Sequence, residues 1–261
     1  MWLHGSSAFS QNLEKIDTKH PVTISGSMGA NVGLYTAFGS PSRRDPFQWL
    51  FQGNLNINLL NLIDIPLSAN FSQQNQSFMQ PFNQYGASPK YKFLTLHAGY
   101  RNMTFSQLAL AGHTFFGAGA EVNAGNWRFG GCFGRFRKAI DFELADANGV
   151  DISYKRLGYA AKVGYGTGRD FIDVSMLKAW DDVQSVRFSS DSLSEITPEE
   201  NLVFTIAGKK SIGKRIVIEG EYGRTALTRD LRSEEIQSGT LYDGLGKFFT
   251  PRSSTYYRPA F

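Results

Sequence analysis

The stretch GHTFFGAGAEVNAGNWRFGGCFGRFR, residues 112–137, folds back on itself about a centre at residues 124–125. Side chains alternate faces along a strand, and cross-strand partners share a face. One face of the predicted hairpin is apolar, and its cross-strand pairs are Val122–Trp127, Ala120–Phe129, Ala118–Gly131 and Phe116–Phe133. The opposite face carries mostly small side chains and places Glu121 across from Arg128. One face therefore suits lipid and the other a crowded or watery lumen, which predicts a hairpin of a membrane barrel.

The same alternation recurs along the chain and predicts about ten antiparallel strands in an all-β fold. The polar rows are Asn, Gln, Ser, Thr and Gly with few charges, a composition typical of a lumen wall more than of a solvated surface. The fold class predicted is an antiparallel transmembrane β-barrel. Strands are expected at 22–35, 47–59, 65–72, 92–101, in the opening hairpin, and at 153–166, 171–180, 202–210 and 214–225.

Composition excludes several classes of protein. The mean hydropathy is −0.28, and no apolar run is long enough for a transmembrane helix, although barrel strands average out in such a scan. The net charge is +4, but the 27 basic residues are scattered among 23 acidic ones, so no nucleic-acid partner is predicted. Cys132 is the single cysteine, which excludes an intramolecular disulfide and a thiolate metal cluster.

Three regions are expected. Residues 1–20 form a tail whose Ala8-Phe9-Ser10 has the spacing of a signal-peptide cleavage site, an ordinary disordered N-terminus being the alternative. Residues 21–226 hold the strands, and 227–261 form a long loop or the start of further strands. Because Pro259 removes a ladder donor where a closing strand would pair, the sheet is expected to be an incomplete part of a larger barrel.

Connection lengths are informative at two segments. After the fifth strand, tight turns alternate with long polar loops, as in outer-membrane barrels. Before it the alternation fails, because 73–90 and 102–111 are both long. Either a strand is hidden there, or one of these loops folds into the lumen.

Two sets of candidate residues follow from the alternation. Mixed charge on the inner set argues for a plugged or structural interior at least as strongly as for a conducting pore. Arg135 and Arg137 are predicted to face outward and to reach the membrane interface. The inner polar set is Glu121, Arg128, Lys162, Asp173, Lys209, Arg215, Glu219, Glu221, His97 and His113. The lipid-facing set is Phe47, Trp49, Phe51, Phe116, Phe129, Phe133, Val163, Val174, Ile206 and Ile218.

No catalytic, metal or cofactor site is predicted. Ser106 lies between His97 and His113 in sequence, which invites a lipase interpretation. Barrel lipases, however, hold their nucleophile on the lipid side beside a histidine and an orienting partner, and no serine here has that setting. His4 and His20 fit no metal spacing.

Four segments carry a resemblance to a known group of proteins. They are PVTISGS (21–27), QPFNQYG (80–86), HAGYRNMTFSQLALAGHTFFGAGAEV (97–122) and RLGYAAKVGYG (156–166). They resemble uncharacterised porin-like outer-membrane barrels common in Bacteroidota, and the likeness extends over nearly the whole chain. The resemblance implies the outer membrane of a Gram-negative bacterium, lipid and lipopolysaccharide around the barrel, and further strands. It implies no catalytic signature.

Two functional classes are expected, with a third as a weaker alternative. The first is a porin-like channel for small polar solutes, favoured by a wide lumen. The second is a non-conducting barrel that serves secretion, adhesion or envelope assembly, favoured by a lumen filled by 73–90 or 102–111. The third is a soluble all-β domain. Expected partners are the barrel-assembly machinery, which often recognises a terminal aromatic such as Phe261, and secretion or envelope proteins.

Overall fold

In a computed structural model, the described part of the chain forms a single antiparallel sheet of thirteen strands. The structure describes residues 20–39, 46–73, 83–142, 145, 151–186, 196–213, 215–236 and 249–260. The strands are β1 (Val22–Leu34), β2 (Phe47–Leu59), β3 (Ile63–Ser72), β4 (Gln84–Ala87), β5 (Lys90–Tyr91), β6 (Leu94–Thr104), β7 (Ala111–Ala124), β8 (Trp127–Arg137), β9 (Lys155–Gly166), β10 (Phe171–Asp182), β11 (Glu200–Ile212), β12 (Ile216–Thr228) and β13 (Thr255–Ala260). A single turn of 3-10 helix, η1 (Val183–Ser185), follows β10. Within this part of the chain, no helix is long and apolar enough to cross a membrane.

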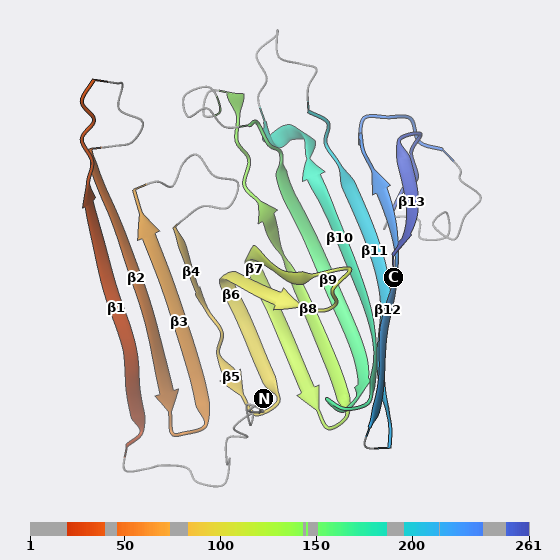
Figure 1. The fold of residues 1–261 in the computed structure, drawn as a ribbon, viewed down its shortest axis with the longest axis horizontal. Coiled ribbons are helices and arrows are strands. Elements are labelled where there is room, and N and C mark those ends of the chain that lie inside the picture. The colour runs from red at the N-terminus through yellow and green to blue at the C-terminus, as the bar shows by residue number, and fades with distance from the viewer. Residues whose placement is uncertain are drawn as a thin grey trace.

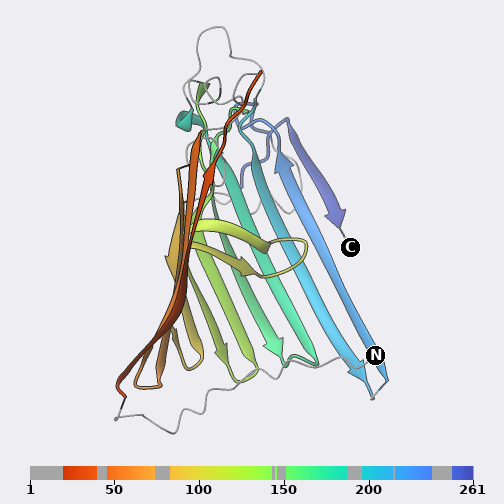
Figure 2. The same cartoon turned by 60° about the vertical axis from the view of Figure 1, so that its left-hand side comes forward.

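Successive strands are neighbours throughout the sheet, from β1 at one side to β13 at the other (Figure 1). The sheet is curled, and its concave side faces the viewer in Figure 2. Among the described residues β1 and β13 do not pair with each other, so the sheet is open. β13 pairs with residues 223–228 of β12 and leaves 216–222 as an edge.

The prediction of ten strands was too low because β4, β5 and β13 were missed. β4 and β5 together occupy the one place between β3 and β6. Ser88-Pro89 separates them, and proline cannot donate to the ladder, so the alternation is too short to be recognised. Pro259 lies in β13 at the edge of the sheet, where proline is tolerated, so it was wrong to count it against a strand there.

With the missed strand included, short turns alternate with longer connections along the whole sheet. Tight turns at 60–62, 92–93, 125–126, 167–170 and 213–215 lie at one end of the sheet. Apart from the segment 105–110, the longer connections join the strands at their opposite ends (Figure 1). We call these the turn end and the loop end.

The predicted register of β7 and β8 was wrong by two residues. The turn is Gly125-Asn126, with Gly125 at φ 61°, and Ala124 pairs with Trp127. Glycine at the first position of a two-residue turn suits the type II′ conformation. Because the shift is two residues and the side-chain period is also two, every residue keeps its predicted face.

A three-residue turn predicted at 211–213 pairs Ile206 with Ile218, which puts the register of β11 and β12 wrong by four residues, again without changing faces. Ile206 pairs with Tyr222 and not with Ile218, and the connection is 213–215, with Gly213 at φ 62°. The register of β9 and β10 was predicted correctly. Between β9 and β10, the predicted two-residue turn at Gly168-Arg169 implies that Val163 pairs with Val174, and the structure has this pair.

A row of glycines crosses the middle of the sheet. Each is the cross-strand partner of the next, so none of the four ladders has a side chain at this level. A Cβ atom added at Gly117 would clash with the Phe133 carbonyl oxygen, and one at Gly134 with the Phe116 carbonyl oxygen. Glycine therefore permits the close approach of strands that tight curvature demands. The glycine row is Gly86, Gly99, Gly117, Gly134 and Gly158.

Candidate functional site: the two faces of the sheet

The outer, convex face is apolar and largely uncovered. All ten residues predicted to face lipid lie on it, and Phe133 and Ile218 are 58% and 59% exposed. On β1, Met28 is 82% exposed. Contiguous apolar surface of this kind is rare on soluble monomers and marks contact with a membrane or another protein.

Aromatic side chains flank this apolar surface at two levels. Near the turn end, Trp127 stacks on Phe129 at 5.8 Å and meets Tyr165 edge-on at 5.0 Å. Toward the loop end, Tyr159 lies 5.9 Å from Trp180. Two aromatic levels on either side of an apolar band are typical of strands that cross a bilayer.

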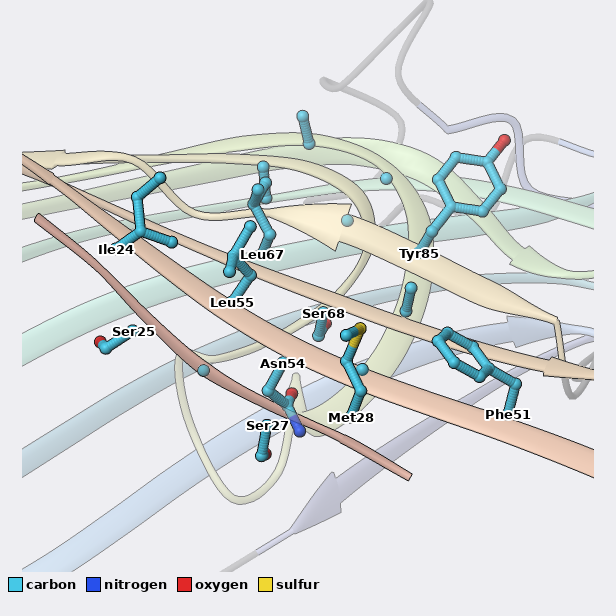
Figure 3. A pocket seen from close by; sticks show the side chains of 17 residues that line it. Ile24, Ser25, Ser27, Met28, Phe51, Asn54, Leu55, Leu67, Ser68 and Tyr85 are labelled. Carbon is cyan, nitrogen blue, oxygen red and sulfur yellow. The ribbon is translucent and has the colours of Figure 1, made fainter. Parts of the chain in front are cut away.

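A groove hollows the outer face over β1–β6 (Figure 3). Met28, Phe51 and Tyr85 stand along it, and Gly53 and Ala98 leave room between them. Its volume is about 720 Å³. At the opposite side of the sheet, Phe249 covers Leu202 and Ala226 on the outer face of β11 and β12.

The inner face of β1–β3 is polar and bare. Every residue of β1 is exposed, whichever face of the sheet it lies on. Its inner residues are small or carry amides and hydroxyls, as the sequence predicts for a wall in contact with water. They are Thr23, Ser25, Ser27, Gly29, Asn31 and Gly33.

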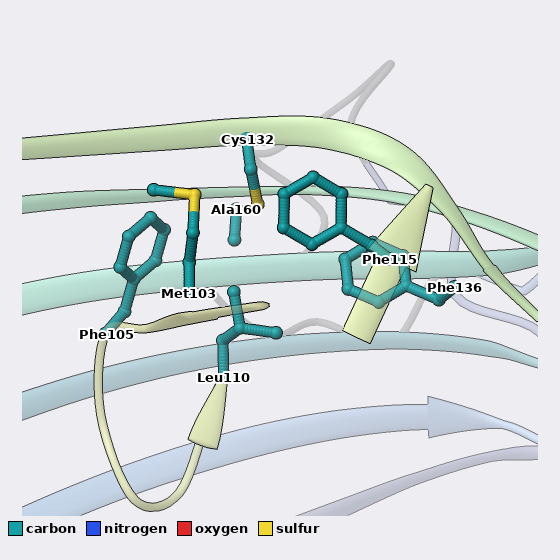
Figure 4. Close-up of a cluster of buried hydrophobic side chains, with 7 residues drawn as sticks. All are labelled: Met103, Phe105, Leu110, Phe115, Cys132, Phe136 and Ala160. Atoms are coloured by element: carbon teal, nitrogen blue, oxygen red, sulfur yellow. The ribbon is translucent and has the colours of Figure 1, made fainter. Parts of the chain in front are cut away.

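The inner face of β7–β10 is covered by an apolar cluster that the sequence did not predict. The segment 105–110, between β6 and β7, folds into the concave side of the sheet (Figure 2). Phe105 and Leu110 point from it toward Phe115 and Cys132 (Figure 4). The cluster comprises Met103, Phe105, Leu110, Phe115, Cys132, Phe136 and Ala160. Of the two explanations for the long connections, a hidden strand holds for 73–90 and an inward fold for 102–111.

Glu221 on β12 holds this inner segment in place. Its carboxylate accepts hydrogen bonds from the Ser106 hydroxyl, and from the backbone N–H groups of Gln107 and Leu108 at 3.1 Å each. Ser106 Oγ also accepts from the N–H of Ala109 at 2.9 Å. Hydrogen bonds to an ionised acceptor are stronger than neutral ones, so this contact ties the segment firmly across the sheet. We call it the Glu221 clasp.

The predicted pair of Glu121 and Arg128 does not form, because the register is shifted by two residues. Arg128 Nη2 instead lies 2.7 Å from Asp173 Oδ1. Glu121 Oε2 lies 3.1 Å from His97 Nε2. Each partner belongs to the predicted inner set, but the predicted pairing within that set was wrong.

The remaining predicted inner residues have mixed roles. The Lys162 ammonium lies 5.4 Å from the centre of the Phe105 ring, and Lys209 Nζ lies 3.2 Å from Glu219 Oε2. His113 stacks on Phe136. Arg215 lies in the turn before β12 and so is not part of the wall.

A charged cluster closes the inner face at the loop end. Asp181 is 2% exposed and receives Arg156 Nε at 2.7 Å and Arg137 Nη2 at 3.2 Å. Glu199 adds a second carboxylate, 2.9 Å from Arg156. The outward prediction for Arg137 was therefore wrong, because the register shifts between Arg135 and Arg137 and reverses the phase of the strand.

No described residues support the Ser106 lipase interpretation, since Ser106 is bonded to Glu221. The sequence did not predict a hydrogen-bonded row of three side chains, in which Ser88 Oγ lies 3.0 Å from His97 Nδ1 and His97 Nε2 bonds the Glu121 carboxylate. Ser88 lies between β4 and β5, and it could not be assigned to a face of the sheet because neither strand was predicted. In the neutral tautomer with the proton on Nε2, His97 donates to Glu121 and accepts from Ser88. The part of the chain described here holds no group of side chains that could bind a metal ion.

Comparison of the chain with protein families, curated proteins and solved structures gave no match. The candidate site therefore rests on the geometry of the two faces.

Proposed function

We propose that this chain forms the wall of an outer-membrane β-barrel in a Gram-negative bacterium and that the barrel passes small polar solutes. The observation that supports this most is the outer face, where exposed apolar side chains continue from β1 to β12. On β8–β10 they lie between two aromatic levels. A soluble all-β domain would leave this surface wet, which makes it the weakest alternative.

The proposal includes closure of the sheet. Unpaired backbone groups are costly in lipid, and only closed barrels satisfy them in a β protein. We therefore infer that the edges at β1 and β12–β13 are paired in the membrane and that the sheet belongs to a larger closed barrel.

Passage of solutes is supported by the polar inner face of β1–β3, where β1 is exposed along its whole length. The segment 105–110 narrows the opposite side of the concavity and is held there by the Glu221 clasp. The inner charges are of mixed sign, so we expect weak selection between cations and anions.

The same inner segment favours a second candidate function. An apolar cluster of seven buried side chains, Phe105 and Phe115 among them, is more than a narrow constriction requires. A non-conducting barrel that acts as a scaffold for secretion, adhesion or envelope assembly would use such a filled interior.

Single-channel recording of the refolded full-length chain in a planar bilayer tests the proposal. We expect discrete conductance steps, and larger or noisier steps from Glu221→Ala, which releases the inner segment. Insertion without conductance, for the wild type and for Glu221→Ala, would support the scaffold. A protein that stays monomeric and β-rich in detergent-free buffer would refute membrane insertion altogether.

A further inference from the structure

Arg135 places a positive charge on the outer, apolar face of the sheet. Its guanidinium lies 5.2 Å from the centre of the Phe116 ring, and its Nη2 donates to the Tyr100 hydroxyl at 2.7 Å. Within the described part of the chain Arg135 takes part in no ion pair, whereas Arg128 and Arg156 are each bound to a carboxylate. The neighbours of Arg135 stabilise the cation but do not neutralise it.

The groove on the outer face begins beside this cation. The Tyr85 ring, which borders the groove, lies 6.3 Å from Tyr100 and 6.1 Å from Phe116. From Tyr85 the groove continues over Gly53 to Met28. The Tyr85 end of the groove therefore adjoins an aromatic group that carries a cation. The rest of the groove is apolar and floored by small residues (Figure 3).

We propose that this surface binds a phosphorylated, acylated lipid, with the phosphate at Arg135 and the Tyr100 hydroxyl and an acyl chain in the groove. The proposal rests on the proposed membrane location. A guanidinium offers a planar fork of donors that matches a phosphate, and a cation that faces lipid is tolerated where it reaches an anionic headgroup. β8 runs from the turn end to the loop end, which places Arg135 in the leaflet at the loop end.

The groove argues for a lipid over free phosphate. At about 720 Å³ it is large enough for part of an acyl chain. Glycine and alanine on the floor keep it open, since a larger side chain at Gly53 would project between Met28 and the Phe51 ring. Free phosphate would use only the Arg135 end.

Native mass spectrometry of the detergent-refolded, full-length protein tests this with two matched probes. Dipalmitoyl phosphatidic acid and dipalmitoylglycerol share their acyl chains and differ in the phosphate. We expect the wild type to retain the phosphorylated lipid about tenfold better, and Arg135→Gln to abolish this preference. Gly53→Leu, whose Cβ atom would meet its neighbours at ordinary contact distances, should lower retention of both lipids.

Arg224→Gln is the matched control, because Arg224 also faces outward, on β12, but does not border the groove. Its lipid retention should equal that of the wild type. Equal retention of the two probes by the wild type, or an unchanged preference in Arg135→Gln, would overturn the proposal. So would competition by inorganic phosphate at the concentration of the lipid. Failure of the wild type to fold in detergent would instead refute the proposed membrane function.

Discussion

The inner faces of β1–β3 and of β6–β9 differ although both come from the same alternation of side chains. The first is a single layer whose inner surface is polar and exposed. The second carries the glycine row, the apolar cluster and the segment 105–110. Alternation fixes which side chains share a face, while the connection between two strands decides whether that face is left to water or covered.

The largest difference in stability between the two regions should appear when a glycine in each is replaced. Gly117→Val sets side-chain atoms against the Phe133 carbonyl oxygen, whereas Gly29→Val, on the inner face of β1, has nothing within 4 Å of its Cβ. We expect the first to lower the free energy of unfolding by about 3 kcal/mol or more and the second by well under 1 kcal/mol. Urea titration of the refolded protein in detergent or lipid measures both, and equal losses would contradict the close strand approach.

A charge on the outer face should cost less than the clash at Gly117 but more than a charge on the bare inner face. Val174 is 50% exposed on the outer face of β10, and Val174→Arg should lose about 2–4 kcal/mol if it lies near the bilayer midplane. Ser27→Arg, on the inner face of β1, should lose much less. Refolding titrations in lipid vesicles compare them, and a larger loss at Ser27 would reverse the assignment of the faces.

Loss of the Glu221 clasp should lower the free energy of unfolding by less than the two changes above. Its effect should be confined to the region covered by the segment 105–110. Glu221→Gln weakens three hydrogen bonds to the segment 105–110 and should destabilise the protein by about 1–3 kcal/mol. The matched control is Glu219→Gln, since Glu219 is 60% exposed and bonds only Lys209 among the interactions of the described residues. Hydrogen exchange of residues 105–110 is the sharper measurement, and it should speed up for Glu221→Gln alone.

The smallest expected effect concerns the pairing of charges. A double-mutant cycle on Arg128 and Asp173, reversed singly and together, should show a coupling of about 1 kcal/mol, because both side chains are mostly buried. The same cycle on Arg128 and Glu121 should show almost none. The opposite result would restore the register that the sequence alone predicts for β7 and β8.

Much of the sheet could be predicted from the sequence, because strands such as β2 and β9 alternate over a dozen residues. Register could not, since pairs such as Val122 with Trp127 or with Phe129 both match apolar residues and differ only in where the turn falls. A shift by two preserves every face, so the hydrophobic pattern does not oppose it. Only the conformation of Gly125 decides between them.

The sequence predicted which face of the sheet the candidate-site residues lie on, but not which partners they contact. His97, Glu121, Arg128 and Asp173 were all assigned inward, yet the predicted pair of Glu121 and Arg128 depended on a β7–β8 register that was two residues out of place. Phe105 and Phe115 gave no sign that they would form a core inside the concavity, because an inward fold of 105–110 depends on long-range contacts such as that with Glu221. The groove is also a product of tertiary structure, since it joins small residues from five strands.

The glycine row has a mechanical consequence. A single pleated layer such as β1–β3 bends easily, but a sheet creased along one line and backed by Phe115 and Phe136 is stiff across that line. In the closed membrane barrel that we propose, we expect the lateral pressure of the bilayer to deform the β1–β3 panel first and to leave the line through Gly117 and Gly134 unchanged. The opening of that barrel would then be oval, with a rigid corner and a compliant side, and its size would vary by movement of the compliant side alone.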